Sequence, residues 1–106
     1  MINYNITSKD IKWDGVTRSI VLVEFTIKDG ASPGEFASSL PLDTYEKFSE
    51  EGLVISGRGP IWTFGMFAPL FPDFNFAGIF DPRLGVVIIQ SFIDQIEVGE
   101  VWEVAP

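Results

Sequence analysis

The segment LVISGRGP, residues 53–60, has the pattern of a buried strand that leads straight into a helix. A short apolar run bounded by turn residues is typical of a fully buried strand, and Gly52 ends a helix before it. Pro60 suits the first turn of a helix, because its missing N–H would have no partner there. The middle of the chain therefore passes from helix to strand and back to helix, as it does where helices cover a sheet.

Strand patterns flank this segment on both sides. Residues 19–27, SIVLVEFTI, are rich in β-branched side chains and predict a central strand, with which INYNI at residues 2–6 is expected to pair. Residues 76–80 and 86–91 predict the two strands of a hairpin. DPRLG at residues 81–85 joins them, with proline and glycine placed for a tight turn.

Two helix-start patterns lie between residues 32 and 52. Ser32 precedes Glu35, and Asp43 precedes Glu46, at the spacing of a capping box, in which two side chains bond the first free amides of a helix. These patterns predict one broken helix or two short ones.

The last pattern is EVGEVWEV, residues 97–104, which alternates acidic and apolar side chains as an exposed edge strand does. The order of elements is then strand, strand, helix, strand, helix, strand, strand. This order predicts an α+β fold in a single domain over residues 1–106, with a mixed β-sheet and helices packed on one face.

The composition limits the class of protein. A chain of 106 residues with 46% apolar side chains fits one domain. A net charge of −8 argues against duplex DNA as a partner, because that affinity comes from cations on the protein. The chain has no cysteine, its opening residues lack the pattern of a secretory signal, and the apolar residues 60–72 are too few for a membrane span. We expect a cytoplasmic protein without a membrane partner.

The first candidate site is the turn formed by Ser56, Gly57, Arg58 and Gly59. Free amides and the dipole of a helix start favour an anion there, and Arg58 could bind a phosphate through two parallel hydrogen bonds. A simpler interpretation is that the glycines only form the turn and Arg58 caps the sheet.

The second candidate site is the turn of the predicted hairpin. Asp81 is a preferred first residue of such turns and so has a structural explanation, whereas Arg83 is the only cation after Gly59. A solvated arginine in a turn is the simpler interpretation. If the two turns share one rim of the sheet, two arginines and a carboxylate would suit a phosphodiester.

Other catalytic groups are missing. The chain has no histidine, which excludes a Ser-His-Asp triad, an imidazole general base and a histidine metal site. Its carboxylates show no ligand spacing, and a solvated acidic surface explains them. The residues themselves predict no metal site.

Two motifs in this order, VISGRGPIW at residues 54–62 and DPRLGVVIIQS at residues 81–91, carry a resemblance to a known family. In them the chain resembles the small CRISPR-associated proteins of the third Csx type, which are the third class of CRISPR ring nuclease. The resemblance is strongest over residues 52–91 and extends to nearly the whole chain. It implies a ferredoxin-like α+β domain that forms homodimers and binds cyclic tetra-adenylate, a cyclic oligoadenylate, between two stacked dimers. It also implies cleavage of this RNA second messenger to linear products, which ends type III CRISPR antiviral signalling.

By position, the family's ligand-binding serine and arginine fall on Ser56 and Arg58, and its catalytic aspartate and arginine fall on Asp81 and Arg83. The chain departs from the family pattern where histidines are expected, since it has there Pro69, Pro72, Asp73 and Phe92. Manganese is the cofactor that the resemblance implies. Without the histidines, we expect cleavage to be slow and to have no absolute need for that metal.

Three functions stay open. The leading one is a cyclic oligoadenylate ring nuclease, the second is a cleavage-deficient sensor or sponge for the same messenger, and the third is a structural homo-oligomer. Residues 61–76 carry more aromatic surface than one small core readily hides, so we also predict at least a dimer, with Trp62, Phe67 or Phe71 at the interface.

Overall fold

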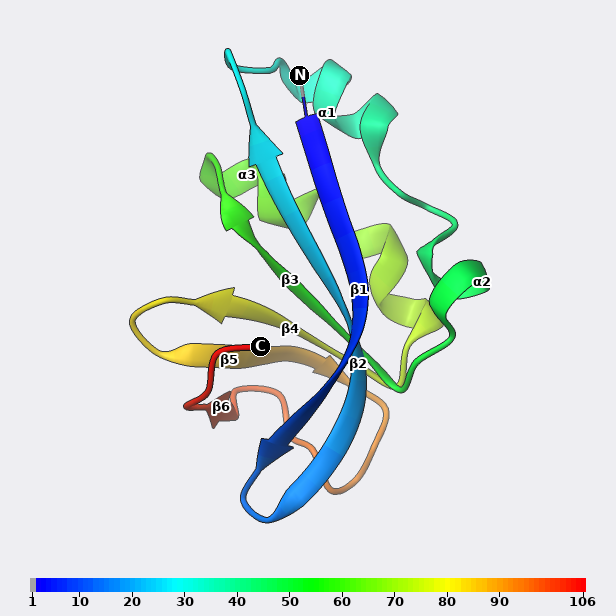
Figure 1. Cartoon of the computed structure of the whole chain (residues 1–106), viewed down its shortest axis with the longest axis vertical. Coiled ribbons are helices and arrows are strands. Elements are labelled where there is room, and N and C mark those ends of the chain that lie inside the picture. Colours follow the sequence, from blue (N-terminus) through cyan, green and yellow to red (C-terminus); the bar gives the residue numbers. More distant parts are fainter. Residues whose placement is uncertain (1) are drawn as a thin grey trace.

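Two long antiparallel strands, β1 (Ile2–Trp13) and β2 (Val16–Ile27), open the fold in the computed structural model, which describes residues 2–106 (Figure 1). Asp14 and Gly15 make the turn between them, both at positive φ (52° and 78°). Such a two-residue Asp-Gly turn matches the twist of a hairpin. Both strands are longer than the predicted segments, because pairing continues down to this turn.

The six strands form one mixed sheet in the order β1-β2-β3-β4-β5-β6. The pairs β2/β3 and β3/β4 are parallel, and the remaining neighbours are antiparallel. This arrangement confirms the predicted α+β fold with a mixed sheet, and it is consistent with a ferredoxin-like α+β domain. The four later strands are β3 (Gly52–Arg58), β4 (Phe76–Asp81), β5 (Gly85–Ser91) and β6 (Val101–Trp102).

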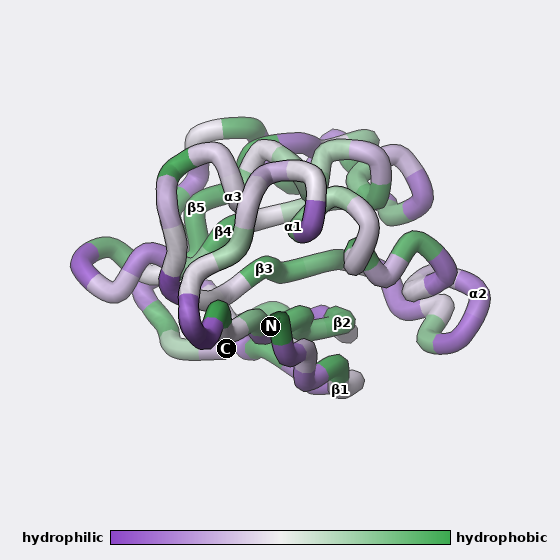
Figure 2. The backbone as a smooth tube through the Cα atoms, turned by 90° about the horizontal axis from the view of Figure 1, so that it is seen from above, coloured by the Kyte–Doolittle hydropathy of each residue, from purple (hydrophilic) through white to green (hydrophobic). Residues whose placement is uncertain are grey.

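Short helices fill the two connections between parallel strands. The first connection holds α1 (Pro33–Ser39) and α2 (Thr44–Phe48), and the second holds α3 (Ile61–Gly65) and the 3₁₀ helix η1 (Ala68–Asp73). Both connections advance across the sheet in the same direction, and the right-handed rule for such crossovers then places their helices on the same face. Figure 2 shows α1 and α3 lying over the apolar β3.

The two capping predictions have different outcomes. Ser32 accepts a hydrogen bond from the Glu35 N–H (3.2 Å), and Glu35 accepts one from the Ser32 N–H (3.1 Å), which confirms the first capping box. The second is wrong, because Asp43 makes no side-chain bond to the helix backbone and instead pairs with Lys47 at 3.1 Å. The backbone of Asp43 has ψ of 12°, whereas a capping residue is normally extended.

The core has one cluster on each face of the sheet. The cluster under the helices contains Val21, Val23, Phe25, Phe36, Leu53, Ile55, Phe67, Leu70, Phe71, Phe74 and Ala77. The cluster on the opposite face contains Ile11, Ile20, Leu22, Val54, Phe76, Val86, Ile88, Ile96 and Trp102. The predicted exposed edge strand over residues 97–104 is therefore only partly right, since just Val101 and Trp102 pair with β5 and Trp102 is buried.

The predicted interface aromatics lie mostly inside the chain. Phe67 and Phe71 are buried in the cluster under the helices, so their assignment to an interface is wrong. Trp62 is half-buried and packs its ring edge-on against Phe36, with 5.7 Å between ring centroids. The reason is that α3 and η1 fold back over the sheet and bring their aromatic side chains against β2 and β3.

Across residues 2–106, none of the helices has both the length and the apolar composition that a bilayer span requires.

Candidate functional site

The three strands β2, β3 and β4 run parallel, so their carboxyl ends meet at one edge of the sheet. Ligands of sheets with parallel strands commonly bind outside this edge. The structure has a cleft of about 490 Å³ at this place. The residues that line the cleft come from the ends of all three strands: Glu24, Phe25, Thr26, Ser56, Gly57, Arg58, Phe80 and Pro82.

The strand register sets which side chains line this cleft. Glu24 lies opposite Ser56, and Thr26 lies opposite Arg58, in the parallel β2/β3 pair. Alternate residues of a strand point to opposite faces. Since Leu53 and Ile55 face the helices and Val54 faces away from them, Ser56 and Arg58 continue the face away from the helices. The two predicted ligand-binding side chains therefore share one face and one cleft.

Arg58 is the distinctive cation of this cleft. Its side chain is exposed, and it makes no hydrogen bond or ion pair with any other residue in the range 2–106. The other two arginines are engaged, Arg18 with Glu51 at 2.7 Å and Arg83 with Asp81 at 3.0 Å. An unpaired guanidinium has five donors in a planar fork that matches a phosphate. Arg58 is thus free to bind an anion.

The glycines beside Arg58 have a packing role on the other face of β3. A Cβ on Gly57 would come within 2.5 Å of the Phe25 ring and 2.7 Å of the Phe25 carbonyl oxygen. A Cβ on Gly59 would lie 2.9 Å from the Thr63 hydroxyl. These glycines let the Phe25 ring lie against the strand. The following helix α3 has only 5 residues, so the positive charge of this site comes mainly from Arg58 and little from a helix dipole.

The second predicted pair forms a closed local unit. The Asp81 carboxylate accepts hydrogen bonds from the Arg83 backbone N–H (2.8 Å), Nε (3.3 Å) and Nη2 (3.0 Å). The backbone bond is the expected turn contact of an aspartate. The hydrogen bond from the Arg83 side chain is the main cause that holds the pKa of Asp81 below its usual value. Both oxygens of Asp81 are therefore occupied by Arg83.

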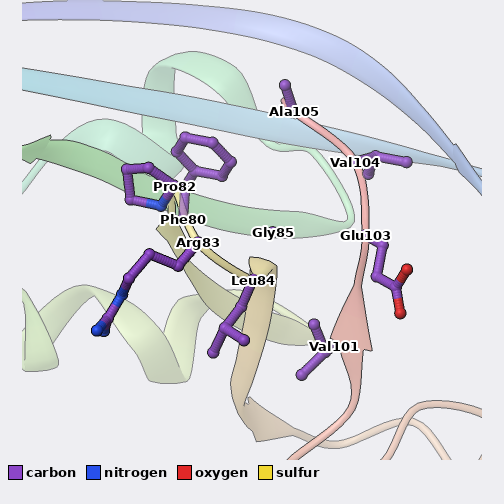
Figure 3. A pocket seen from close by; sticks show the side chains of 9 residues that line it. All are labelled: Phe80, Pro82, Arg83, Leu84, Gly85, Val101, Glu103, Val104 and Ala105. Carbon is purple, nitrogen blue, oxygen red and sulfur yellow. The ribbon is translucent and has the colours of Figure 1, made fainter.

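Arg83 lines a second hollow of about 580 Å³ next to the first (Figure 3). The turn between β4 and β5 forms one side of this hollow, and the chain after β6 forms the other, with Glu103 exposed on it. Phe80 and Pro82 line both hollows. The structure therefore places the two predicted pairs on one edge of the sheet but in two adjoining hollows, where the sequence had suggested a single rim.

Sequence reasoning did not identify Glu24, Thr26 and Phe80 as site residues. Glu24 accepts a hydrogen bond from the Asn5 side-chain amide at 3.2 Å. A signal was present, because Glu24 is the only charged residue in the apolar strand segment 19–27. Its place beside Ser56 follows only from the register of β2 against β3.

The donor set of the chain does not fit a manganese site. The chain has no histidine and no cysteine, and within residues 2–106 no three carboxylates come together as a group that could hold a metal ion. The carboxylate of the hairpin turn itself, that of Asp81, is engaged by Arg83.

Comparison with known proteins agrees with the motifs. A protein of Aquifex aeolicus (strain VF5), described as an uncharacterized protein, is 33% identical over 99 residues, which cover 88% of this chain and 89% of the relative. The sequence profile of the family described as "CRISPR-associated protein (Cas_csx3)" matches residues 42–103, a span that includes both candidate turns and strands β3 to β6. The chain therefore belongs to the Cas_csx3 family of CRISPR-associated proteins.

Proposed function

We propose that this CRISPR-associated protein binds cyclic tetra-adenylate at the cleft of Arg58 and opens its ring, which would end type III CRISPR antiviral signalling in the cytoplasm. The observation that carries the proposal is the unpaired Arg58 guanidinium in a cleft at the carboxyl ends of three strands. Ser56 adds a hydroxyl on the same face. The backbone N–H of Gly59, the first residue after β3, can also donate to a phosphate oxygen.

The proposed chemistry is attack of a ribose 2′-oxygen on its own neighbouring phosphorus. The 2′-oxygen to phosphorus bond forms, the bond to the 5′-oxygen breaks, and the 2′-hydroxyl proton passes through solvent to the leaving oxygen. Arg83 stabilises the charge that develops on the phosphoryl oxygens. Asp81 orients the 2′-hydroxyl through Oδ2, which accepts one hydrogen bond from Arg83 and has a second lone pair.

A second candidate function is a sensor or sponge that binds the messenger without cleaving it. The pairing of Asp81 with Arg83 favours this alternative, because three hydrogen bonds already hold the carboxylate against the turn. Incubating the protein with radiolabelled cyclic tetra-adenylate separates the candidates. Linear products support a ring nuclease, and retention of the intact ring without products supports a sensor. If the protein gives neither products nor retention, the remaining function is a structural homo-oligomer.

A homodimer, stacked in pairs around the ligand, is part of the proposal. With Phe67 and Phe71 buried, the apolar side chain that supports a contact near the cleft is Ile61, which follows Arg58 by three residues and is 91% exposed. Light scattering with and without cyclic tetra-adenylate measures this assembly. A monomer mass at micromolar concentration in both conditions contradicts it.

Replacing Arg58 with alanine should weaken binding of cyclic tetra-adenylate at least about tenfold, since a hydrogen bond to a charged group contributes about 1.5–3 kcal/mol. Calorimetry on both proteins measures the change. Lys12→Ala is the matched control, because it removes the same charge from an exposed cation beside the β1–β2 turn. Equal affinities for the wild type and Arg58→Ala would remove the support for this cleft.

Arg83→Ala should lower the rate of cleavage more than the affinity, because the interaction grows as charge develops on phosphorus oxygens. The rate should be nearly constant between about pH 6 and 8, where no unperturbed side chain of this chain titrates. The pKa of Asp81 is lowered, so its pairing with Arg83 is complete above the ordinary aspartate range and is lost only as the pH falls through that lowered value.

Single-turnover cleavage across pH, with EDTA and manganese arms, measures these effects. The products should end in 2′,3′-cyclic phosphates, which attack by the 2′-oxygen leaves behind. Products that end in a 3′-hydroxyl, or a rate that depends wholly on manganese, would show that another nucleophile does the chemistry.

A further inference from the structure

Phe80 and Pro82 form the wall between the two hollows at the carboxyl edge of the sheet. Phe80 is the next-to-last residue of β4, and its ring is half-buried against the cluster on the sheet face away from the helices. Figure 3 shows the Phe80 ring beside Pro82, while the side chains of Arg83 and Leu84 extend away from them. The wall is thus a flat apolar surface that remains partly open.

One arginine lies on each side of this wall. Arg58 lines the hollow between β2 and β4, and Arg83 lines the hollow between the β4–β5 turn and the chain after β6. Arg58 favours an anion because its guanidinium is unpaired, whereas Arg83 is paired with Asp81 and offers an anion its Nη1 donors, which make no bond within residues 2–106. A flat apolar group is favoured between the two arginines. A nucleotide unit within an oligonucleotide offers these groups together, because its ribose bears a phosphate on the 5′ side and another on the 3′ side and carries the flat base at C1′.

We propose that Phe80 is a stacking platform for one base of the ligand, and that the phosphates on the two sides of that nucleotide bind Arg58 and Arg83. The inference rests on the proposed function and deepens it, since it defines the smallest unit that occupies both hollows as an adenosine with phosphates at both the 5′ and 3′ positions. A single aromatic platform suits any base, because each base has a π-face. Phe80 therefore gives affinity for nucleic-acid bases as a class, and anions without a base gain nothing from it.

The test compares wild type with Phe80→Leu, which keeps an apolar side chain at this half-buried position but removes the flat ring, and with Phe80→Tyr, which keeps the ring. Calorimetry with cyclic tetra-adenylate, adenosine 3′,5′-bisphosphate and inorganic tetraphosphate reports affinity for each. Phe92→Leu is the control, because Phe92 is 65% exposed and lines neither hollow. Circular dichroism confirms that each variant is folded.

We expect Phe80→Leu to weaken binding of cyclic tetra-adenylate and of the bisphosphate by roughly five- to a hundredfold, the range for loss of one base–aromatic stack. Tetraphosphate binding should not change, and Phe80→Tyr should bind as the wild type does. If Phe80→Leu keeps wild-type affinity for cyclic tetra-adenylate while Arg58→Ala loses it, the stacking inference is wrong and the proposed function stands.

A wild-type protein that does not bind cyclic tetra-adenylate overturns the proposed function. The bisphosphate then decides the stacking inference by itself. Binding that Phe80→Leu weakens supports the inference, and absence of wild-type binding to the bisphosphate overturns it.

Discussion

Phe67→Ala should lower the free energy of unfolding by about 3–5 kcal/mol, the usual result of truncating a fully buried phenylalanine. Phe67 has no exposed surface. Its ring contacts those of Tyr4, Phe25 and Phe36, with centroid distances of 6.3, 5.5 and 5.7 Å. The substitution would therefore open a cavity where α3 meets the sheet. Because small domains are stable by only about 5–15 kcal/mol, much of the protein would be unfolded under mild denaturant.

Urea denaturation at two protein concentrations measures this prediction. A core role gives the same loss at both concentrations, whereas an interface role makes the loss depend on concentration. Phe92→Ala is the control and should change the stability by less than about 0.5 kcal/mol, as exposed positions usually do. If the loss of unfolding free energy in Phe67→Ala depends on protein concentration, Phe67 lies at an interface and the core assignment is wrong.

Gly85→Ala is expected to have the second large effect. Gly85 has φ of +111°, and a Cβ there would overlap the Trp102 carbonyl oxygen and lie 2.9 Å from the Glu103 Cα. Backbone strain of this kind costs about 1–3 kcal/mol, and a steric overlap in packed surroundings adds about 1–3 kcal/mol. The relief available to the chain is to release β6, which pairs with β5 through Val101 and Trp102 and is joined to Ile88 of β5 by two more backbone hydrogen bonds just before it.

Release of β6 would expose Trp102, whose ring lies 5.3 Å from that of Phe76. Denaturation curves together with tryptophan fluorescence should therefore show lower stability and a red-shifted emission. Gly99→Ala is a matched control, because Gly99 also has positive φ (+97°) but has nothing within 4 Å of its Cβ position. Gly99→Ala therefore adds backbone strain without a steric overlap. Equal effects of the two substitutions would show that the contact with Trp102 is unimportant.

The elements of the fold were predictable where the signal is local. The hairpin turn at residues 81–85 was predicted from Asp81, Pro82 and Gly85, and Asp81 makes the predicted bond to the Arg83 amide. The capping box of Ser32 was equally local. Asp43 has the same sequence spacing but fails, because the backbone before α2 is not extended. A capping pattern in the sequence gives the residue types that a cap needs. The backbone conformation of the capping residue is set by tertiary structure.

The site was predictable only in part, because its remaining features depend on register and packing. Arg58 and Ser56 share a face through simple strand alternation, and the sequence was enough for that. The place of Glu24 beside Ser56 depends on how β2 and β3 align. The burial of Phe67 depends on the return path of α3 and η1 over the sheet. The separation into two hollows depends on Phe80 and Pro82, whose position no local pattern indicated.

The order of strands in the sheet follows the order of synthesis from β1 to β6. Each strand that leaves the ribosome can therefore pair with the strand made just before it, and none has to insert between two that are already paired. Hairpins form within microseconds, whereas translation adds only about 5–20 residues per second. The sheet can grow while the chain is being made, but the sheet face that Trp102 covers stays exposed until β6 emerges. A nascent chain stalled before β6 would consequently display Leu22, Val54 and Phe76 to chaperones.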